Sequence, residues 1–365
     1  MTDATGIRAP DPDGAAADVP TLDEATFLKT AKRRSTRRIL LLAGALVVAA
    51  VIVLGAALSL WHWRLQSQSE RIDGYCLPLI SISSPNTRIL LPGTTRTRFP
   101  GAVNEYLAYR TVGDVLVPVG EVSVEFDVWG GEQMRGVSSN LWMTSVARSD
   151  NGRRFAASPP APELSFLIPA EVSELPVDPA DTASTEPTPA THDEELVSAE
   201  LAEFAAETES SLSRLMSAPP DSTVELAVSF RTTISLAQVE SLLGKNLELS
   251  WGATFVYPDS TLAGSVQTGH LVGVDFSRAG MNPSVVGWET RQQAEDQLTA
   301  RLRGIAESAP HGTADLCLKS AKYLEEHGVS YFGVVVCGSP EAALALARDS
   351  LVSAVSLGLV VMPWE

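Results

Sequence analysis

The acidic residues of this sequence are abundant but form no recognisable catalytic or metal-binding pattern, and its histidines and cysteines are few and widely separated. Its histidines are His62, His192, His270, His311 and His327. None lies three or four residues from another, the spacing that sets two imidazoles on one face of a helix. No C-x-x-C pair occurs, and no Walker A, G-x-S-x-G, H-E-x-x-H or dinucleotide-binding motif. We therefore expect a protein that is not an enzyme, with no catalytic residue, no metal site and no cofactor.

The clearest structural element is an uncharged apolar segment, Ile39 to Trp61. As a helix it would extend about 35 Å, enough to cross the hydrocarbon core of a bilayer. Closely before it stand the basic residues Lys29, Lys32, Arg33, Arg34, Arg37 and Arg38. The positive-inside rule then predicts one membrane span with a cytoplasmic N-terminus. The apolar run is too long for the h-region of a cleaved signal peptide, so a signal anchor is favoured.

Charge differs between the two sides of this segment. Residues 1–38 carry 7 of the 27 basic and 6 of the 44 acidic residues, so the remainder has a net charge of −18. An acidic exterior disfavours nucleic acid as a partner. The cysteines Cys76, Cys317 and Cys337 would all lie outside, where disulfides persist. Cys317 and Cys337 are candidate partners, but a helix packed on a sheet holds such residues about 10 Å apart, and buried free thiols are the alternative.

Composition and periodicity predict an α+β chain: a single N-terminal transmembrane helix, a β-rich membrane-proximal region and a C-terminal mixed α/β domain. The expected boundaries are a tail at 1–38, the span at 39–61, the β-rich region at 62–170, an acidic Pro/Thr linker at 171–195 and the C-terminal domain at 196–365. A polar stem, Gln66 to Gly74, follows the span. The strand Glu121 to Trp129 alternates apolar and polar residues, with one face buried.

After Ser222, strand and helix signals alternate, as in a layered domain. Strands are expected at 224–230, 247–257, 270–276, 331–337 and 354–362, and helices at 236–243, 291–308, 314–327 and 340–348. In the β-rich region we expect strands at 106–111, 141–147 and 164–168. Trp251 alternates with leucines on one strand face, which favours a core role over a ligand-stacking one.

The N-terminal tail contains a helix-start signature, in which Thr21 precedes Glu24 by three residues. A helix from there would run through the basic cluster into the span. The candidate partner-binding residues on it are Leu22, Phe27, Leu28, Lys32, Arg33 and Arg34. This face would dock a cytoplasmic partner; alternatively, the helix is an extension that lies near the lipid headgroups.

Several segments, in order, resemble the bacterial sigma factor regulator family. The tail resembles it where Phe27 to Arg37 runs directly into the apolar segment, and the outer region at 83–86, 109–114, 118–121, 224–230, 249–252, 331–338 and 351–358. The resemblance implies a membrane-bound, anti-sigma-type regulator with N- and C-terminal sigma regulator domains. Its partner would be a sigma factor or a membrane protein that binds one. The family has no catalytic motif to transfer.

The hypothesis from the sequence is a single-pass membrane protein that couples an extracytoplasmic domain to cytoplasmic control of an extracytoplasmic-function sigma factor. Its contact with the lipid bilayer would be through Ile39–Trp61. The first alternative is a structural or interaction module of the cell envelope, anchored by one helix. The second is an envelope hydrolase, because sequence alone cannot show which carboxylates meet in space.

Overall fold

The structure is a computed structural model, and it describes residues 24–113, 115–129, 132–136, 164–169, 193–254, 266–267, 272–276 and 290–362. The chain divides into two compact units, residues 1–62 and residues 63–365. In the first unit the described residues are helical, and they belong to α1 (Glu24–Ser83). The side chains from Lys32 to Leu60 are exposed. Among the described residues, α1 is a helix that is long and apolar enough to cross a membrane, and the mean hydropathy of its most apolar stretch is 2.9.

Within the second unit, α1 continues as a helix as far as Ser83. The prediction of a polar stem at Gln66 to Gly74 is wrong in one respect, because these residues belong to a helix that has a buried apolar face. That face carries Leu65, Ile72, Cys76 and Leu79, all buried, at spacings of seven, four and three residues. Such spacing places them on one side of a helix with 3.6 residues per turn.

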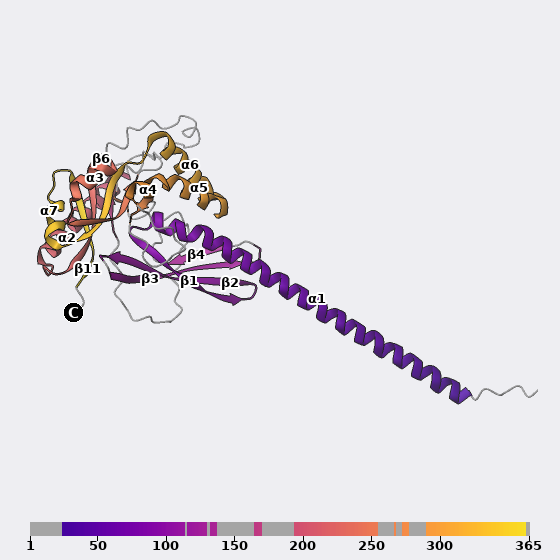
Figure 1. Ribbon diagram of the computed structural model, residues 1–365. Helices are drawn as coiled ribbons and strands as arrows, with labels where there is room; N and C mark the ends of the chain where they lie inside the picture. Colours follow the sequence, from indigo (N-terminus) through magenta and orange to yellow (C-terminus); the bar gives the residue numbers. More distant parts are fainter. Residues whose placement is uncertain are drawn as a thin grey trace, which may run out of the picture. The chain divides into compact units, whose positions relative to one another are not determined.

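Next to this helical segment lies a four-stranded antiparallel sheet in the order β1-β2-β3-β4. Its strands are β1 (Thr87–Arg98), β2 (Gly101–Val112), β3 (Val115–Asp127) and β4 (Glu132–Gly136). The predicted alternation is confirmed in β3, where Val122, Val124 and Phe126 are buried and their neighbours are not. The β-rich region predicted after the apolar segment is therefore confirmed (Figure 1).

The C-terminal region contains a five-stranded sheet in the order β11-β6-β10-β7-β9, with every neighbouring pair antiparallel. Its strands are β6 (Thr223–Ile234), β7 (Leu247–Thr254), β9 (Val272–Asp275), β10 (Tyr331–Gly338) and β11 (Val352–Val361). A further small sheet pairs β5 (Phe166–Leu167) with β8 (Val266–Gln267).

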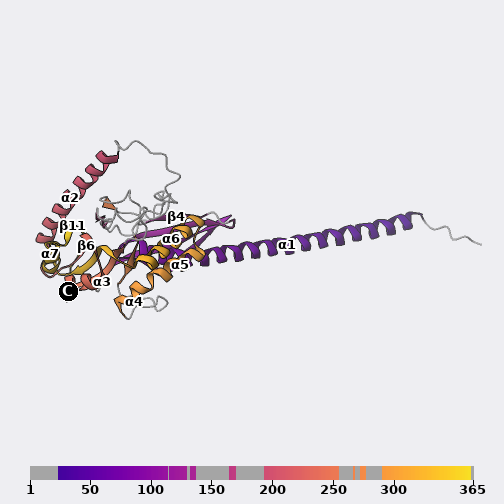
Figure 2. The ribbon, with the colours of Figure 1, turned by 90° about the horizontal axis from the view of Figure 1, so that it is seen from above.

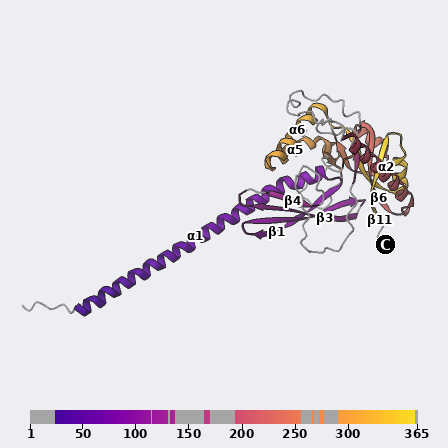
Figure 3. The ribbon, with the colours of Figure 1, turned by 180° about the vertical axis from the view of Figure 1, so that it is seen from behind.

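Six further helices accompany the strands in the described part of the chain. They are α2 (Asp193–Ser217), α3 (Leu236–Leu243), α4 (Arg291–Asp296), α5 (Leu298–Ser308), α6 (His311–His327) and α7 (Pro340–Ala347). Helix α2 packs on β11 and α7, while α5 and α6 pack on each other (Figures 2 and 3). The combination of helices with antiparallel sheets confirms the α+β class.

Most predicted elements after Ser222 match the structure. The helix expected at 291–308 is divided at Gln297, which ends α4 and begins α5. The strand expected at 141–147, the end of the one at 247–257 and the start of the one at 270–276 lie outside the described residues. All three cysteines are buried and none forms a disulfide, so the candidate pairing of Cys317 with Cys337 is not formed.

A cluster around Trp251 forms the core of the C-terminal sheet. Trp251 is fully buried, and the centroid of the Phe166 ring lies 6.0 Å from that of Trp251 and 6.3 Å from that of Phe332. Leu164, Ile168, Ala227, Ala253 and Val335 complete the cluster. The prediction that Trp251 is a core residue is confirmed. Segment 164–169 thus belongs to the same core as the C-terminal strands.

Candidate functional site

Helix α1 leads into β1 through a tight turn. The amide of Thr87 donates to the carbonyl oxygen of Ser84 at 3.0 Å, which closes this turn. Asn86 occupies the left-handed region with φ of 51°, a conformation that Asn tolerates better than most residues. The turn is buried, and Asn86 is 1% exposed. Its side chain donates to the carbonyl oxygen of Thr111 in β2 at 2.8 Å. The end of α1 is therefore fixed to the first sheet.

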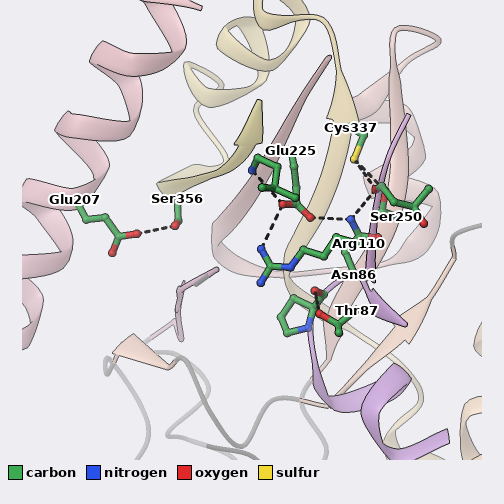
Figure 4. Close-up of polar contacts among 11 residues, drawn as sticks. Asn86, Thr87, Arg110, Glu207, Glu225, Ser250, Cys337 and Ser356 are labelled. Carbon is green, nitrogen blue, oxygen red and sulfur yellow. Dashed lines mark hydrogen bonds and ion pairs between the residues drawn. The ribbon is translucent and has the colours of Figure 1, made fainter. Parts of the chain in front are cut away.

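The same Asn86 amide donates to a carboxylate from the C-terminal sheet. Glu225 of β6 is 0% exposed, and its Oε1 lies 2.7 Å from Asn86 Nδ2 (Figure 4). Its Oε2 accepts from the backbone amide of Leu359 at 3.2 Å and lies 3.4 Å from Nη1 of Arg110 in β2. We call Asn86, Arg110, Glu225 and the Leu359 amide the Glu225 site. It joins the turn after α1, the first sheet and two strands of the second.

A buried carboxylate is costly unless its charge and lone pairs are compensated. Here both oxygens accept hydrogen bonds, and the Arg110 side chain, 8% exposed, supplies the opposite charge. A Cβ added at Gly358 would collide with the carboxylate, so glycine leaves room for it. Loss of one partner would leave a buried group uncompensated, so the site favours one arrangement of these elements over others.

The strand beside Glu225 carries a buried thiol. Cys337 of β10 is the register partner of Glu225, and it accepts a hydrogen bond from Ser250 Oγ at 3.4 Å. Its own thiol donates to the Thr111 carbonyl oxygen at 3.5 Å (Figure 4). Burial, followed by the charge of Glu225, raises the pKa of Cys337 to about 12. The thiolate is the reactive form, so this arrangement makes Cys337 a packing residue rather than a nucleophile.

Other contacts tie α1 directly to the C-terminal region. The indole Nε1 of Trp251 donates to the carbonyl oxygen of Ser81 at 3.2 Å. Arg71 Nη1 donates to the carbonyl oxygen of Ser308, at the end of α5, at 3.3 Å. Through these bonds, two separate positions of the buried segment of α1 contact the C-terminal region.

The first sheet also holds α1 through polar side chains. Asn104 of β2 donates to Ser69 Oγ at 2.8 Å, and Tyr106 donates to the carboxylate of Asp73. Burial and then the bond to Asp73 raise the pKa of Tyr106, so it remains a neutral donor. Further along, Arg88 of β1 forms an ion pair with Asp275 of β9 at 3.2 Å. The two sheets and α1 therefore contact one another at several separate points.

An open cleft of about 800 Å³ borders this region. It is lined by residues of α3, the following turn, β7, α4 and the end of β10, including Lys245, Glu248 and Cys337. Across it, Arg291 and Glu240 form an exposed ion pair at 3.3 Å. The lining mixes both charges, and among the described residues no group of three or more potential metal ligands occurs.

The predicted partner-binding residues lie in the other unit. Leu22 is outside the described residues, and Phe27 and Leu28 lie within α1. Lys32, Arg33 and Arg34 are exposed on α1. No contact in the structure tests their role, so it stays a prediction.

Sequence reasoning did not find the Glu225 site. The available signal was one carboxylate within the apolar run Val224 to Phe230, where Glu225 would share a face with Ala227 and Ser229. All three are buried. The hydrogen-bond partner of Glu225, Asn86, is 139 residues away in the sequence, and the two residues meet only in the tertiary structure.

The fold and the Glu225 site define an α+β domain that packs around the C-terminal part of the long helix α1. Hydrogen bonds from the Glu225 site hold the turn that follows this helix. Residues 215–359 match the family described as sigma factor regulator C-terminal. This match confirms, for the C-terminal region, the resemblance to the sigma factor regulator family that the sequence shows. No curated protein and no solved structure matches the chain significantly.

Proposed function

We propose that the protein is a single-pass membrane regulator of anti-sigma type. In this proposal Ile39–Trp61 spans the bilayer, residues 1–38 are cytoplasmic and the remainder is extracytoplasmic, with 171–195 as a linker between the outer regions 62–170 and 196–365. The outer region controls an extracytoplasmic-function sigma factor through the tail, directly or through a membrane protein that binds the factor. The family match at residues 215–359 supports the regulatory class.

The observation that carries the proposal is the Glu225 site. Glu225 lies inside the family-matched region, and it holds Asn86, three residues after the end of α1. The helix that this contact fixes is the one that contains the apolar segment. A change in the C-terminal sheet that moves Glu225 would therefore act directly on the end of that helix. This gives the outer domain a physical route to the span.

The proposed role of the tail in binding a partner can be tested by placing a charge on its apolar face. Phe27→Asp would disrupt a helical docking face, whereas Thr26→Asp adds the same charge about 100° away around the helix axis. Both variants keep the six basic residues before the span, so the orientation of the protein is preserved. We expect Phe27→Asp to derepress a set of envelope-stress genes in the native host, measured by RNA sequencing, and Thr26→Asp to leave them unchanged.

Affinity purification from native membranes, with identification by mass spectrometry, would show the partner. A sigma factor, or a membrane protein carrying one, should be recovered with the parent chain and Thr26→Asp and lost with Phe27→Asp. A chain lacking residues 1–28 should behave as Phe27→Asp does. Unchanged transcription and equal recovery of envelope proteins alone, in all versions, would refute the regulator and favour the anchored envelope module.

A further inference from the structure

Two aromatic side chains are unusually exposed on the first sheet. Phe99, in the turn between β1 and β2, is 81% exposed, and Trp129, just after β3, is 75% exposed. Among the described residues outside α1, no other large apolar side chain is as exposed as either. Large aromatic surface in water is unfavourable, and such residues often mark a contact surface.

Both residues lie at the same end of the sheet. Gly101, two residues after Phe99, is the register partner of Asp127, two residues before Trp129. Asp127 Oδ1 accepts from the Trp129 amide at 2.8 Å, which holds the chain close to the end of β3. We call Arg96–Gly101 with Asp127–Trp129 the sheet tip.

The contacts of β2 show in which direction this tip points. One end of β2 is fixed near the C-terminal end of α1, where Asn86 contacts Thr111. Further along β2 toward the tip, Asn104 contacts Ser69, which lies earlier in the helix. The strand therefore runs alongside α1, as Figures 1 and 3 show. The order of these two contacts means that its tip end points toward the start of this unit at Trp63.

The distances along the two elements also match. From Asn104 to Gly101, three strand residues extend about 10 Å. From Ser69 to Trp63, six helical residues extend about 9 Å. The tip thus reaches the level of Trp63, whose side chain is 63% exposed. In the sequence, Trp63 comes two residues after Trp61, the last residue of the predicted span.

We propose that the sheet tip is a second membrane contact, with Phe99 and Trp129 seated in the headgroup region of the outer bilayer surface. The proposal rests on the predicted span but not on control of a sigma factor. Aromatic residues favour the membrane interface. Exposed Arg98 is placed to meet lipid phosphates, while Arg96 is paired with Glu105 at 2.9 Å. A span with a second contact beside it fixes both the tilt and the rotation of the outer region.

Fluorescent labels on single introduced cysteines would test this contact. The native cysteines are buried, and the parent chain gives the background labelling. Phe99→Cys and Trp129→Cys, in the full chain, would carry an environment-sensitive dye in nanodiscs of phosphatidylcholine and phosphatidylglycerol. Lys322→Cys, whose parent side chain is 74% exposed on α6, reports the aqueous side, and Leu58→Cys reports the span.

We expect the Phe99 and Trp129 labels to emit at shorter wavelength than the Lys322 label and to be quenched by lipid-borne nitroxides. Labels at both tip positions that behave like the one at Lys322 would overturn the proposal, as would a wavelength shift without lipid quenching, which indicates packing on protein. Quenching at Leu58 alone would reject the tip contact and leave the regulator proposal intact. No quenching at Leu58 would reject the span, and both proposals with it.

Discussion

Neutralising Glu225 should destabilise the outer region far more than neutralising an exposed glutamate. Glu225→Gln keeps one carbonyl oxygen able to accept from Asn86, but it removes the charge that faces Arg110. The side-chain NH₂ group of the introduced glutamine would be a donor, and it would face the backbone N–H of Leu359. That N–H is also a donor, so the hydrogen bond that Glu225 accepts there would be lost. Breaking a buried ion pair from one side costs about 3–5 kcal/mol.

The matched control is Glu240→Gln. Glu240 also pairs with an arginine, Arg291, at 3.3 Å, nearly the same distance as at the Glu225 site, but their side chains are 46% and 36% exposed. Exposed pairs contribute at most about 1 kcal/mol. The two variants therefore differ in burial while sharing the same chemical change.

Urea unfolding of the full chain in nanodiscs, followed by tryptophan fluorescence, would measure both effects. With a slope of about 3 kcal/mol per molar urea, Glu225→Gln should lower the midpoint by about 1 M or more. Combining it with Arg110→Met should cost less than the sum of the two single changes, by at least about 1 kcal/mol. Equal midpoints for Glu225→Gln and Glu240→Gln would refute the reasoning, since the Glu225 site would then not hold the elements together.

Further predictions concern Cys337 and two glycines. Cys337 should resist alkylation at about pH 8 in the folded protein and react in urea, as measured by mass spectrometry, because burial raises its pKa to about 12. Since this pKa is raised above the ordinary 9.0, its contribution to stability is present below pH 9 and should be lost as the pH rises toward 12, which lowers the urea midpoint. Gly333→Ala should cost about 1–3 kcal/mol because the added Cβ collides with the Phe166 ring. Gly304→Ala, in α5 with no atom within 4 Å of the new Cβ, should instead stabilise by up to about 1 kcal/mol; the reverse order of midpoints would contradict both assignments.

Local patterns predicted the elements that are specified locally. The alternation in Glu121 to Trp129 predicted β3, because a strand with one buried face needs period two. The helix ended by Gly244 matches α3, whose N-terminus also has a capping box formed by Ser235 and Gln238. The apolar segment at Ile39 to Trp61 lies in α1 as expected. In each case the information lies within a few consecutive residues.

The sequence reading failed where long-range contacts decide the structure. The stem looked polar because residues such as Gln66, Glu70 and Arg71 dominate it, yet Ile72 within the stem and Cys76 just after it are fully buried. A helical period extended from Leu65 would have indicated this face. The single carboxylate in the run Val224 to Phe230 could not reveal its partners, because Asn86 comes from the turn after α1 and Arg110 from the first sheet.

The order of synthesis has a consequence for the buried segment of α1. Ser81 is made 170 residues before its hydrogen-bond partner Trp251. At about 5–20 residues per second, this delay lasts about 10–30 s. During that time the apolar face at Ile72, Cys76 and Leu79 has emerged, while the C-terminal sheet that completes its surroundings does not yet exist. Until the last strands arrive, this face therefore needs another cover, such as a chaperone.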